Sequence, residues 1–489
     1  MSDKKLIRDF GAIFSSEVVL LAASFISFPI FTRILTKSDY GFMSLITMSL
    51  MLIGNVSSGG LNNSILRFYG RHGEIARSIF INTMRTATLG LAVLGTAVYL
   101  FVAWVAYSLG ALSSGLFFVV AFAASLIIIR ALTKVELCFL RVSDHIMLMN
   151  VFNILTRYGG IGASIWLIYK YKSLYSLYVG TLVAELAVLL IIYTWFFLEM
   201  KELKYYPRYS KPVSKEAFIY GLPLAINGLL SIVISSTDRY VIGFFLNVEK
   251  VADYTVAVNY CNFPIEILRN VFLATFVPMI MNSWNKHEKG EREEAQLLTK
   301  FIASYCWLAV PIVFGLILTD TEGIKLLAGS KYVAIPYLVP LLAAAFALNG
   351  MSFVYLSGLL YKKKTMGVLY LNIFTGVINL FLNLVLVSWI GVYGAAIGTL
   401  ISYVLFIIAA SYFSRRELSF TIPVNDIVLS ICAGIFMAIT VVITTRYVNV
   451  SGLLFIKIAI GVFAYGAFVL VFAPSKIRLL HNAFRPSST

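Results

Sequence analysis

Long apolar runs bounded by charged or turn-forming residues dominate the chain. Each is close to the length of about 20 apolar residues that a helix needs to cross a bilayer. A polar, basic stretch at 199–216 separates the sixth run from the seventh. The runs lie at about 11–34, 41–66, 82–107, 114–133, 147–169, 174–198, 218–245, 252–283, 298–319, 333–361, 365–388, 391–413, 425–445 and 452–473. The pattern predicts about fourteen transmembrane helices joined by short loops.

The composition supports an integral membrane protein. Of 489 residues, 60% are hydrophobic and 13% are charged, and the mean hydropathy is +0.88. Soluble proteins carry about 25% charged residues, so no soluble fold of this size could bury so much apolar surface. We therefore expect an all-α membrane protein, and we exclude soluble enzymes and nucleic-acid-binding factors. No nucleic acid is expected as a partner.

The net charge of +16 is explained by the orientation of the chain in the membrane. An even number of spans places both termini on one side. With the termini taken as cytoplasmic, the cytoplasmic segments hold about three times as many Lys and Arg residues as the opposite loops, as the positive-inside rule requires. The N-terminal stretch lacks a small-residue cleavage site after a short apolar core, so we interpret it as a retained first helix.

Short sequence matches indicate an internal duplication. Three pairs recur at offsets of 214 to 219 residues, each on corresponding predicted helices: Asp39-Tyr40 with Asp253-Tyr254, NILT at 153–156 with NIFT at 372–375, and Gly180-Thr181-Leu182 with Gly398-Thr399-Leu400. Because six is an even number of helices, the two halves would have the same orientation in the membrane. Parallel repeats of this kind occur in transporters, where the substrate site lies between the halves. The predicted divisions are a six-helix bundle at 1–200, a cytoplasmic connection at 201–216, a second bundle at 217–415, an additional helix pair at 416–475 and a basic tail at 476–489.

Polar residues form stripes on four equivalent helices of the two halves. At 100° per residue, each set falls on one helix face. The sets are Glu17, Ser24 and Ser27; Asn55, Ser58 and Asn62; Asn227, Ser231, Ser235 and Asp238; and Asn259, Asn262, Glu266, Arg269 and Asn270. The stripes predict the wall of a central aqueous cavity, with Asn55, Asn62, Asn259 and Asn262 as substrate-binding candidates. The alternative is that these groups only join neighbouring helices by hydrogen bonds.

Deep basic residues indicate an anionic substrate. Arg269 and Arg157 lie near the middle of predicted spans, where a guanidinium needs a partner, and a phosphate offers bidentate geometry. Glu266 lies one turn before Arg269, so internal pairing is the alternative there. Arg85, Arg130 and Lys457 lie nearer helix ends, and we expect their side chains to snorkel to the interface.

Four acidic residues are candidates for carrying a proton or sodium ion during transport: Glu17, Glu185, Asp238 and Glu266. Glu17 is the first candidate. Structural ion pairs are the alternative for each of them. The four cysteines lie far apart, and no metal-ligand cluster, Walker A sequence or nucleophile elbow occurs. We therefore expect no enzyme activity, cofactor or metal, and transport driven by an ion gradient, the membrane potential or the substrate gradient.

Two segments resemble a known family. They are RILTKSDYG at 33–41, after the polar first helix, and GVYGAAIGT at 391–399, at the start of the twelfth. With its helix count, duplication and loop sizes, the whole chain resembles the polysaccharide transporter family. That family contains the O-antigen (Wzx-type) oligosaccharide flippases and belongs to the multidrug/oligosaccharidyl-lipid/polysaccharide exporter superfamily.

The resemblance implies two six-helix bundles with the last two helices packed alongside. It also implies a bacterial inner-membrane flippase that moves undecaprenyl-diphosphate-linked oligosaccharide, an O-antigen, capsule or exopolysaccharide unit, to the outer leaflet. Membrane lipid, a polysaccharide polymerase and a chain-length regulator are the expected partners. Arg269 and Arg157 would then meet the diphosphate. The alternatives are a lipid II flippase, a multidrug or ion antiporter and, last, a membrane polymerase or ligase.

Overall fold

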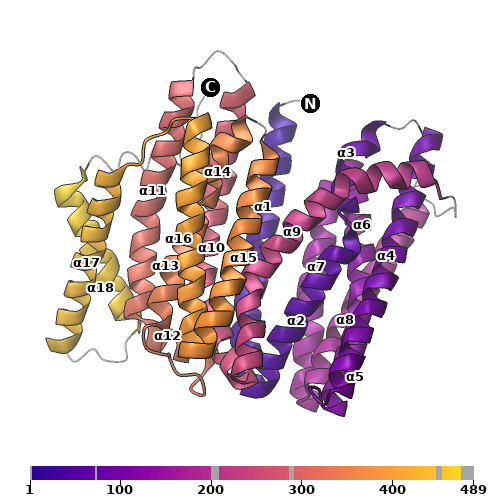
Figure 1. The fold of residues 1–489 in the computed structure, drawn as a ribbon, viewed down its shortest axis with the longest axis horizontal. Helices are drawn as coiled ribbons and strands as arrows, with labels where there is room; N and C mark the ends of the chain where they lie inside the picture. The colour runs from indigo at the N-terminus through magenta and orange to yellow at the C-terminus, as the bar shows by residue number, and fades with distance from the viewer. Residues whose placement is uncertain are drawn as a thin grey trace. The chain divides into compact units, whose positions relative to one another are not determined.

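The computed structural model describes residues 3–71, 74–199, 209–285, 291–362, 364–447 and 454–474. These ranges are almost wholly helical and contain no β-strand, which confirms the predicted all-α class (Figure 1). The helices are α1 (Asp3–Ile34), α2 (Lys37–Ser58), α3 (Leu61–Phe68), η1 (Tyr69–Arg71), α4 (Glu74–Ser108), α5 (Ser114–Ala123), α6 (Ser125–Val142), α7 (Ile146–Tyr171), α8 (Leu174–Glu199), α9 (Lys211–Phe245), α10 (Val248–Asn285), α11 (Glu291–Leu318), α12 (Asp320–Ala328), α13 (Leu338–Gly350), α14 (Ser352–Tyr361), α15 (Thr365–Ile390), α16 (Val392–Glu417), α17 (Val424–Tyr447) and α18 (Leu454–Phe472).

Twelve helical segments in the described ranges are long and apolar enough to cross a membrane. Two further long helices, α7 and α10, have lower hydropathy. Helix α7 carries the mid-span Arg157, and α10 carries one of the polar stripes predicted from the sequence. With these two, each of the fourteen predicted ranges contains a long helix or a pair of consecutive helices. The protein is therefore a multi-pass membrane protein.

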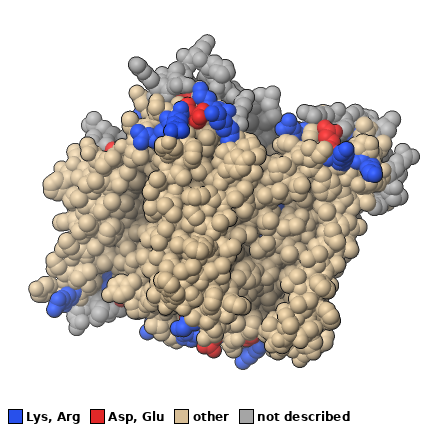
Figure 2. Space-filling model, in the orientation of Figure 1, with Lys and Arg blue, Asp and Glu red and all other residues tan. Residues whose placement is uncertain are grey.

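Charged side chains gather at the helix ends. On the face shown in Figure 2, Lys and Arg lie along two edges, and the band between them is almost free of charge. Large apolar side chains such as Phe101, Phe244 and Phe463 are 63%, 82% and 80% exposed. An apolar band of this kind is suited to contact with lipid hydrocarbon.

The chain divides into two compact units, Met1–Ser236 and Thr237–Thr489. We call them the N-terminal unit and the C-terminal unit. Helix α9 belongs to both, because its residues up to Ser236 pack with the first unit. The finer boundaries expected at 200, 216, 415 and 475 stay predictions, and the connection at 201–208 and the tail at 476–489 lie outside the described residues.

A break between α2 and α3 corrects the single helix predicted at 41–66. Gly59 and Gly60 have φ values of +53° and +70°, a left-handed conformation that glycine adopts without strain. A Cβ on Gly60 would collide with the carbonyl oxygen of Gly221 on α9. The Ser64 hydroxyl also donates to the Ala217 carbonyl oxygen at 2.7 Å. The chain turns here so that α3 can approach α9 closely.

Equivalent helix pairs in the two units pack in the same way, which supports the duplication. Helix α8 lies along α7, and α16 lies along α15. A Cβ on Gly180 of α8 would lie 2.5 Å from the backbone nitrogen of Ser164, and one on Gly398 of α16 would lie 3.3 Å from the Cβ of Leu382. The glycines of the matching Gly-Thr-Leu segments therefore mark the same close approach in both halves.

The last two helices pack on α11 inside the C-terminal unit (Figure 1). The indole nitrogen of Trp307 donates to Asp426 at 3.1 Å, and the Tyr465 hydroxyl donates to the Trp307 carbonyl oxygen at 3.0 Å. Lys457 on α18 forms an ion pair with Glu322 on α12. Contacts at both ends of the pair thus fix it to its own unit.

Candidate functional site

Arg157 is an exposed cation in the middle of α7. Its Nη2 donates to the Ser24 hydroxyl on α1 at 2.6 Å, and the neighbouring Tyr158 hydroxyl donates to the Val19 carbonyl oxygen at 2.8 Å. Arg157 forms no ion pair with any carboxylate of the described residues. Because a charge at mid-span is costly against hydrocarbon, the surface that carries Arg157 faces water, protein or an anionic ligand.

Arg130 on α6 and Glu185 on α8 form an ion pair close to Arg157. The Arg130 Nε donates to both Glu185 oxygens at 2.9 and 3.1 Å, and its Nη2 donates to Oε1 at 2.8 Å. The side chains of Arg130 and Glu185 are 40% and 8% exposed. Arg157 is close enough to both residues for its charge to interact electrostatically with theirs. The predicted ion-coupling residue Glu185 is therefore held by an arginine, and the snorkelling expected of Arg130 is wrong.

A second ion pair lies in the interior of the N-terminal unit. Arg85 on α4 and Glu136 on α6 are 3% and 0% exposed and share two hydrogen bonds. Arg85 was expected at the interface, and Glu136 was not among the sequence candidates. Lys457, for which the same was expected, forms an ion pair with Glu322. Sequence alone gave no signal for these partners, since they lie 51 and 135 residues away along the chain.

The remaining candidates of the N-terminal unit differ in exposure. Glu17 is exposed on α1, two turns before Ser24 and on the same face. Asn55 is half-buried and Asn62 is 8% exposed, and the side-chain oxygen of each is buried without a hydrogen-bond partner in the described structure. The structure thus brings Ser24, Arg130, Arg157 and Glu185 together, whereas no described hydrogen bond joins Asn55 or Asn62 to them.

The candidates on α10 in the C-terminal unit form a local network. Arg269 donates to Glu266 at 3.2 Å, one turn before it, and the Asn262 amide donates to the other Glu266 oxygen at 3.0 Å. The side chains of Arg269 and Glu266 are 33% and 27% exposed. Asn259 is half-buried on the same helix. Arg269 is therefore paired internally, as the alternative interpretation expected, and Glu266 of the same helix compensates the charge of Arg269.

Asp238 on α9 is buried beside Arg239. The carboxylate lies 3.6 Å from the Arg239 guanidinium and accepts the Arg239 backbone N–H at 2.8 Å. The Nε of Arg239 donates to the Thr255 hydroxyl at 3.3 Å. Asp238 was a sequence candidate, whereas Arg239 was not. Within the described ranges, no group of three His, Cys, Asp or Glu side chains is arranged to hold a metal ion.

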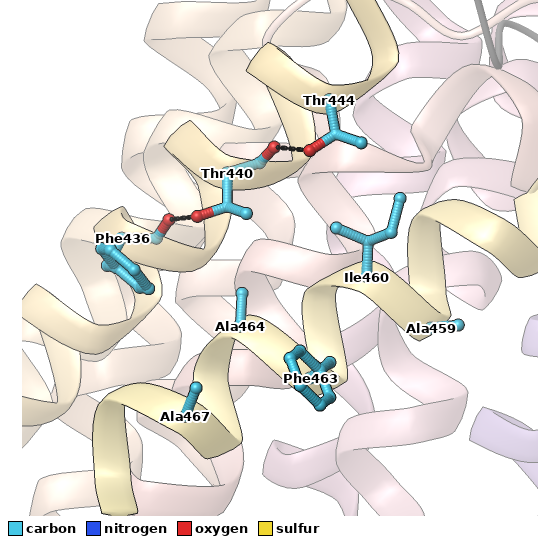
Figure 3. Close-up of a pocket in the computed structure, with 8 residues that line it drawn as sticks. All are labelled: Phe436, Thr440, Thr444, Ala459, Ile460, Phe463, Ala464 and Ala467. Carbon is cyan, nitrogen blue, oxygen red and sulfur yellow. Dashed lines mark hydrogen bonds between the residues drawn. The ribbon is translucent and has the colours of Figure 1, made fainter. Parts of the chain in front are cut away.

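An apolar pocket of about 580 Å³ lies between α17 and α18 (Figure 3). Its residues are Phe436, Thr440, Thr444, Ala459, Ile460, Phe463, Ala464 and Ala467. The two threonine hydroxyls donate to carbonyl oxygens of their own helix, at 2.8 Å for Thr440 and 2.7 Å for Thr444. The pocket therefore offers apolar contacts and no free charged group, which suits a hydrocarbon chain and not a polar headgroup.

Two curated relatives and several solved structures are similar to this chain. It is 22% identical over 281 residues to the "Probable low-salt glycan biosynthesis flippase Agl15" of Haloferax volcanii, covering 56% of this chain and 59% of that protein. It is 25% identical over 268 residues to an uncharacterized membrane protein of Methanocaldococcus jannaschii, covering 54% of this chain and 51% of that one. The chain thus spans between half and three fifths of the length of these relatives.

Among solved structures, the lipid II flippase MurJ in an inward closed conformation matches with a TM-score of 0.76 at 14% identity, covering 96% of this chain and all of that one. An inward-facing multidrug transporter of the MATE family, from the MOP superfamily, matches with a TM-score of 0.63 at 15% identity, covering 82% and 94%. These similarities establish the fold.

The sequence also matches the family described as "Polysaccharide biosynthesis protein" over residues 30–336, more than half of the chain. The matched region extends from α1 to beyond α12, so it includes the Arg157 surface and the α10 network. The matched region also includes segment 33–41, one of the two segments that carried the family resemblance. This chain belongs to the family described as "Polysaccharide biosynthesis protein".

Proposed function

We propose that the protein is a flippase that moves an undecaprenyl-diphosphate-linked oligosaccharide from the cytoplasmic to the outer leaflet of a bacterial inner membrane. The oligosaccharide would be a repeat unit of O-antigen, capsule or exopolysaccharide. Family membership and the flippase named among the relatives support this function. The protein would act as a transporter without catalysis of its own, with both termini in the cytoplasm.

The observation that carries the proposal is the exposed guanidinium of Arg157. It lies at mid-span, has a serine as its described hydrogen-bond partner and has no described carboxylate to neutralise it. A diphosphate supplies the missing negative charge and accepts bidentate hydrogen bonds from a guanidinium. Arg157 is therefore the principal headgroup residue of this proposal. Arg269 contributes less, because Glu266 already compensates its charge.

The polar and acidic candidates take supporting roles. Asn55, Asn62, Asn259 and Asn262 supply amide groups for sugar hydroxyls, and Glu17 is the group most suited to ion coupling because it is exposed and lies on the Ser24 face. Glu185, Asp238 and Glu266 are each held by an arginine and would have to leave that partner to bind an ion. Alternating exposure of the polar surface to the two sides would carry the headgroup across.

A second candidate function differs from the first in its substrate. The MurJ-like fold favours a lipid II flippase, whose substrate also carries a diphosphate and a sugar unit. Deletion of the gene distinguishes the two. The proposal predicts loss of surface polysaccharide, with lipid-linked repeat units retained in the cytoplasmic leaflet and normal cell-wall synthesis. Arrest of cell-wall synthesis with accumulated lipid II would favour the alternative, and altered drug tolerance with normal polysaccharide would favour an antiporter. A polymerase and a chain-length regulator are the expected downstream partners.

A further inference from the structure

Two arginines and one carboxylate share a small region of the N-terminal unit. Arg130 on α6, Arg157 on α7 and Glu185 on α8 come from three helices that pack against one another at mid-span. Arg130 is paired with Glu185, and Arg157 lies close to both. The group therefore carries one net positive charge inside the membrane-spanning part of the protein.

The guanidinium groups retain unused donor capacity. A guanidinium has five N–H donors. Arg130 directs Nε and Nη2 at Glu185, and in the described structure Arg157 donates from Nη2 to Ser24. Arg130 is 40% exposed and Arg157 is exposed, so an incoming anion can reach them, whereas Glu185 is only 8% exposed. The carboxylate is therefore less accessible than either guanidinium.

The other ion pairs do not share this arrangement. The pair of Arg85 and Glu136 is buried, and so is the pair of Asp238 and Arg239. The exposed pair of Arg269 and Glu266 lies within a single helix, and its carboxylate also accepts from Asn262. In the described part of the chain, the group of Arg130, Arg157 and Glu185 combines two accessible guanidinium groups with an excess of one positive charge.

We propose that Arg130 and Arg157 together bind a phosphate group of the substrate, and that Glu185 competes with that phosphate for the Arg130 guanidinium. This inference rests on the proposed function and adds Arg130 and Glu185 to the headgroup site. A phosphate oxygen and a carboxylate oxygen accept the same charge-assisted hydrogen bonds. Glu185 thus keeps Arg130 paired when no substrate is bound, and it helps to release the headgroup after transport.

Competition and simple positioning predict opposite results for Glu185. If the carboxylate competes with phosphate, Glu185→Gln removes the competitor and tightens phosphate binding. If Glu185 only positions Arg130, the same change weakens binding. The Gln side chain has nearly the same shape, and Arg130 can turn to water because it is 40% exposed, so the variant is expected to fold.

The experiment measures binding of farnesyl diphosphate to the purified full-length protein in detergent, with Arg157→Ala, Arg130→Gln and Glu185→Gln variants. Loss of a charge-assisted hydrogen bond changes affinity by about tenfold or more, so the two arginine variants should bind about tenfold more weakly and Glu185→Gln several-fold more tightly. Arg141→Ala is the matched control, because Arg141 is exposed near the end of α6 and should leave binding unchanged.

Arg130→Gln leaves Glu185 without its partner, so the double variant Arg130→Gln/Glu185→Gln restores neutrality and separates folding from binding. Unchanged affinity in this double variant and in Arg157→Ala would overturn the inference while leaving the proposed function intact. Weaker binding of Glu185→Gln would overturn the competition. Absence of farnesyl diphosphate binding to the wild-type protein would overturn both this inference and the diphosphate-linked substrate.

Inorganic pyrophosphate and farnesol identify the source of the phosphate. Farnesyl diphosphate binding more tightly than pyrophosphate, with no binding of farnesol at this site, supports a lipid headgroup. Equal binding of farnesyl diphosphate and pyrophosphate, with the same loss in Arg157→Ala, would support the two-arginine site and contradict its use for a lipid-linked substrate.

Discussion

Arg85 on α4 and Glu136 on α6 meet in the interior of the N-terminal unit, joined by hydrogen bonds of 2.7 and 2.5 Å. Their side chains are 3% and 0% exposed. The rings of Phe139, Tyr193 and Phe196 lie within 5.5 to 5.9 Å of the guanidinium carbon. Because the pair is neutral and closed to solvent, we assign it to the stability of the unit, in contrast to the exposed Arg157.

Removal of one member of this pair should destabilise the protein strongly. Arg85→Met or Glu136→Leu leaves an uncompensated charge in the interior, at a cost of about 3–5 kcal/mol. The double variant Arg85→Met/Glu136→Leu removes both charges and should recover most of that loss. Unfolding of the purified protein in detergent, monitored by circular dichroism, measures the difference. Lys250→Ala, at an exposed position, is the control. Equal stability of single and double variants would contradict the structural role.

The contact between α3 and α9 should tolerate no side chain at Gly60. Gly60→Ala must adopt a positive φ, which costs about 1–2 kcal/mol, and its Cβ collides with the Gly221 carbonyl oxygen. We expect lower thermal stability and lower abundance in membranes. Gly54→Ala is the matched control within α2, because its Cβ meets nothing within 4 Å and Ala favours the helix by up to about 1 kcal/mol. Normal stability of Gly60→Ala would show that the break between α2 and α3 differs from the one described.

Transport should depend more on Arg157 than on Arg269. Arg157→Ala removes a cation with no described carboxylate partner, whereas Arg269→Ala removes one that Glu266 neutralises. We expect surface polysaccharide to fall about tenfold or more with Arg157→Ala and less with Arg269→Ala when each variant complements a deletion strain. Protein abundance is measured in parallel. The reverse order would assign the headgroup to the α10 network instead.

Ion coupling should depend on Glu17. Replacement by Gln removes the charge but keeps the size of this exposed side chain on α1. We expect Glu17→Gln to bind farnesyl diphosphate as tightly as the wild type but to lose the response of transport to an imposed proton or sodium gradient. Glu249→Gln, exposed in the first turn of α10, is the control. A full gradient response in Glu17→Gln would remove Glu17 from the coupling mechanism.

Hydropathy predicted the fold well because the membrane restricts the chain to helices. The same pattern did not predict the break at Gly59 and Gly60, which depends on the approach of α9 from more than 150 residues away. Two consecutive glycines permit a turn, and the contact of Gly60 with Gly221 on α9 explains why the conformation changes there.

The site was predicted in part. The position of Arg157 at mid-span followed from the sequence, but the pairing of Arg130 with Glu185 did not, because periodicity does not show which faces of distant helices meet. The partner of Arg269 was visible, since Glu266 lies one turn away on the same helix. Local pairs can therefore be anticipated from spacing, whereas pairs between helices require the three-dimensional structure.

The most direct test of the central claim is transport by the purified protein reconstituted into liposomes. Lipid-linked oligosaccharide is placed in one leaflet, and its appearance in the other is followed with a membrane-impermeant reagent that modifies the sugar. We predict that the wild-type protein moves the lipid-linked oligosaccharide and that Arg157→Ala moves it about tenfold more slowly. Movement no faster than in protein-free liposomes, under every imposed gradient, would contradict the flippase function.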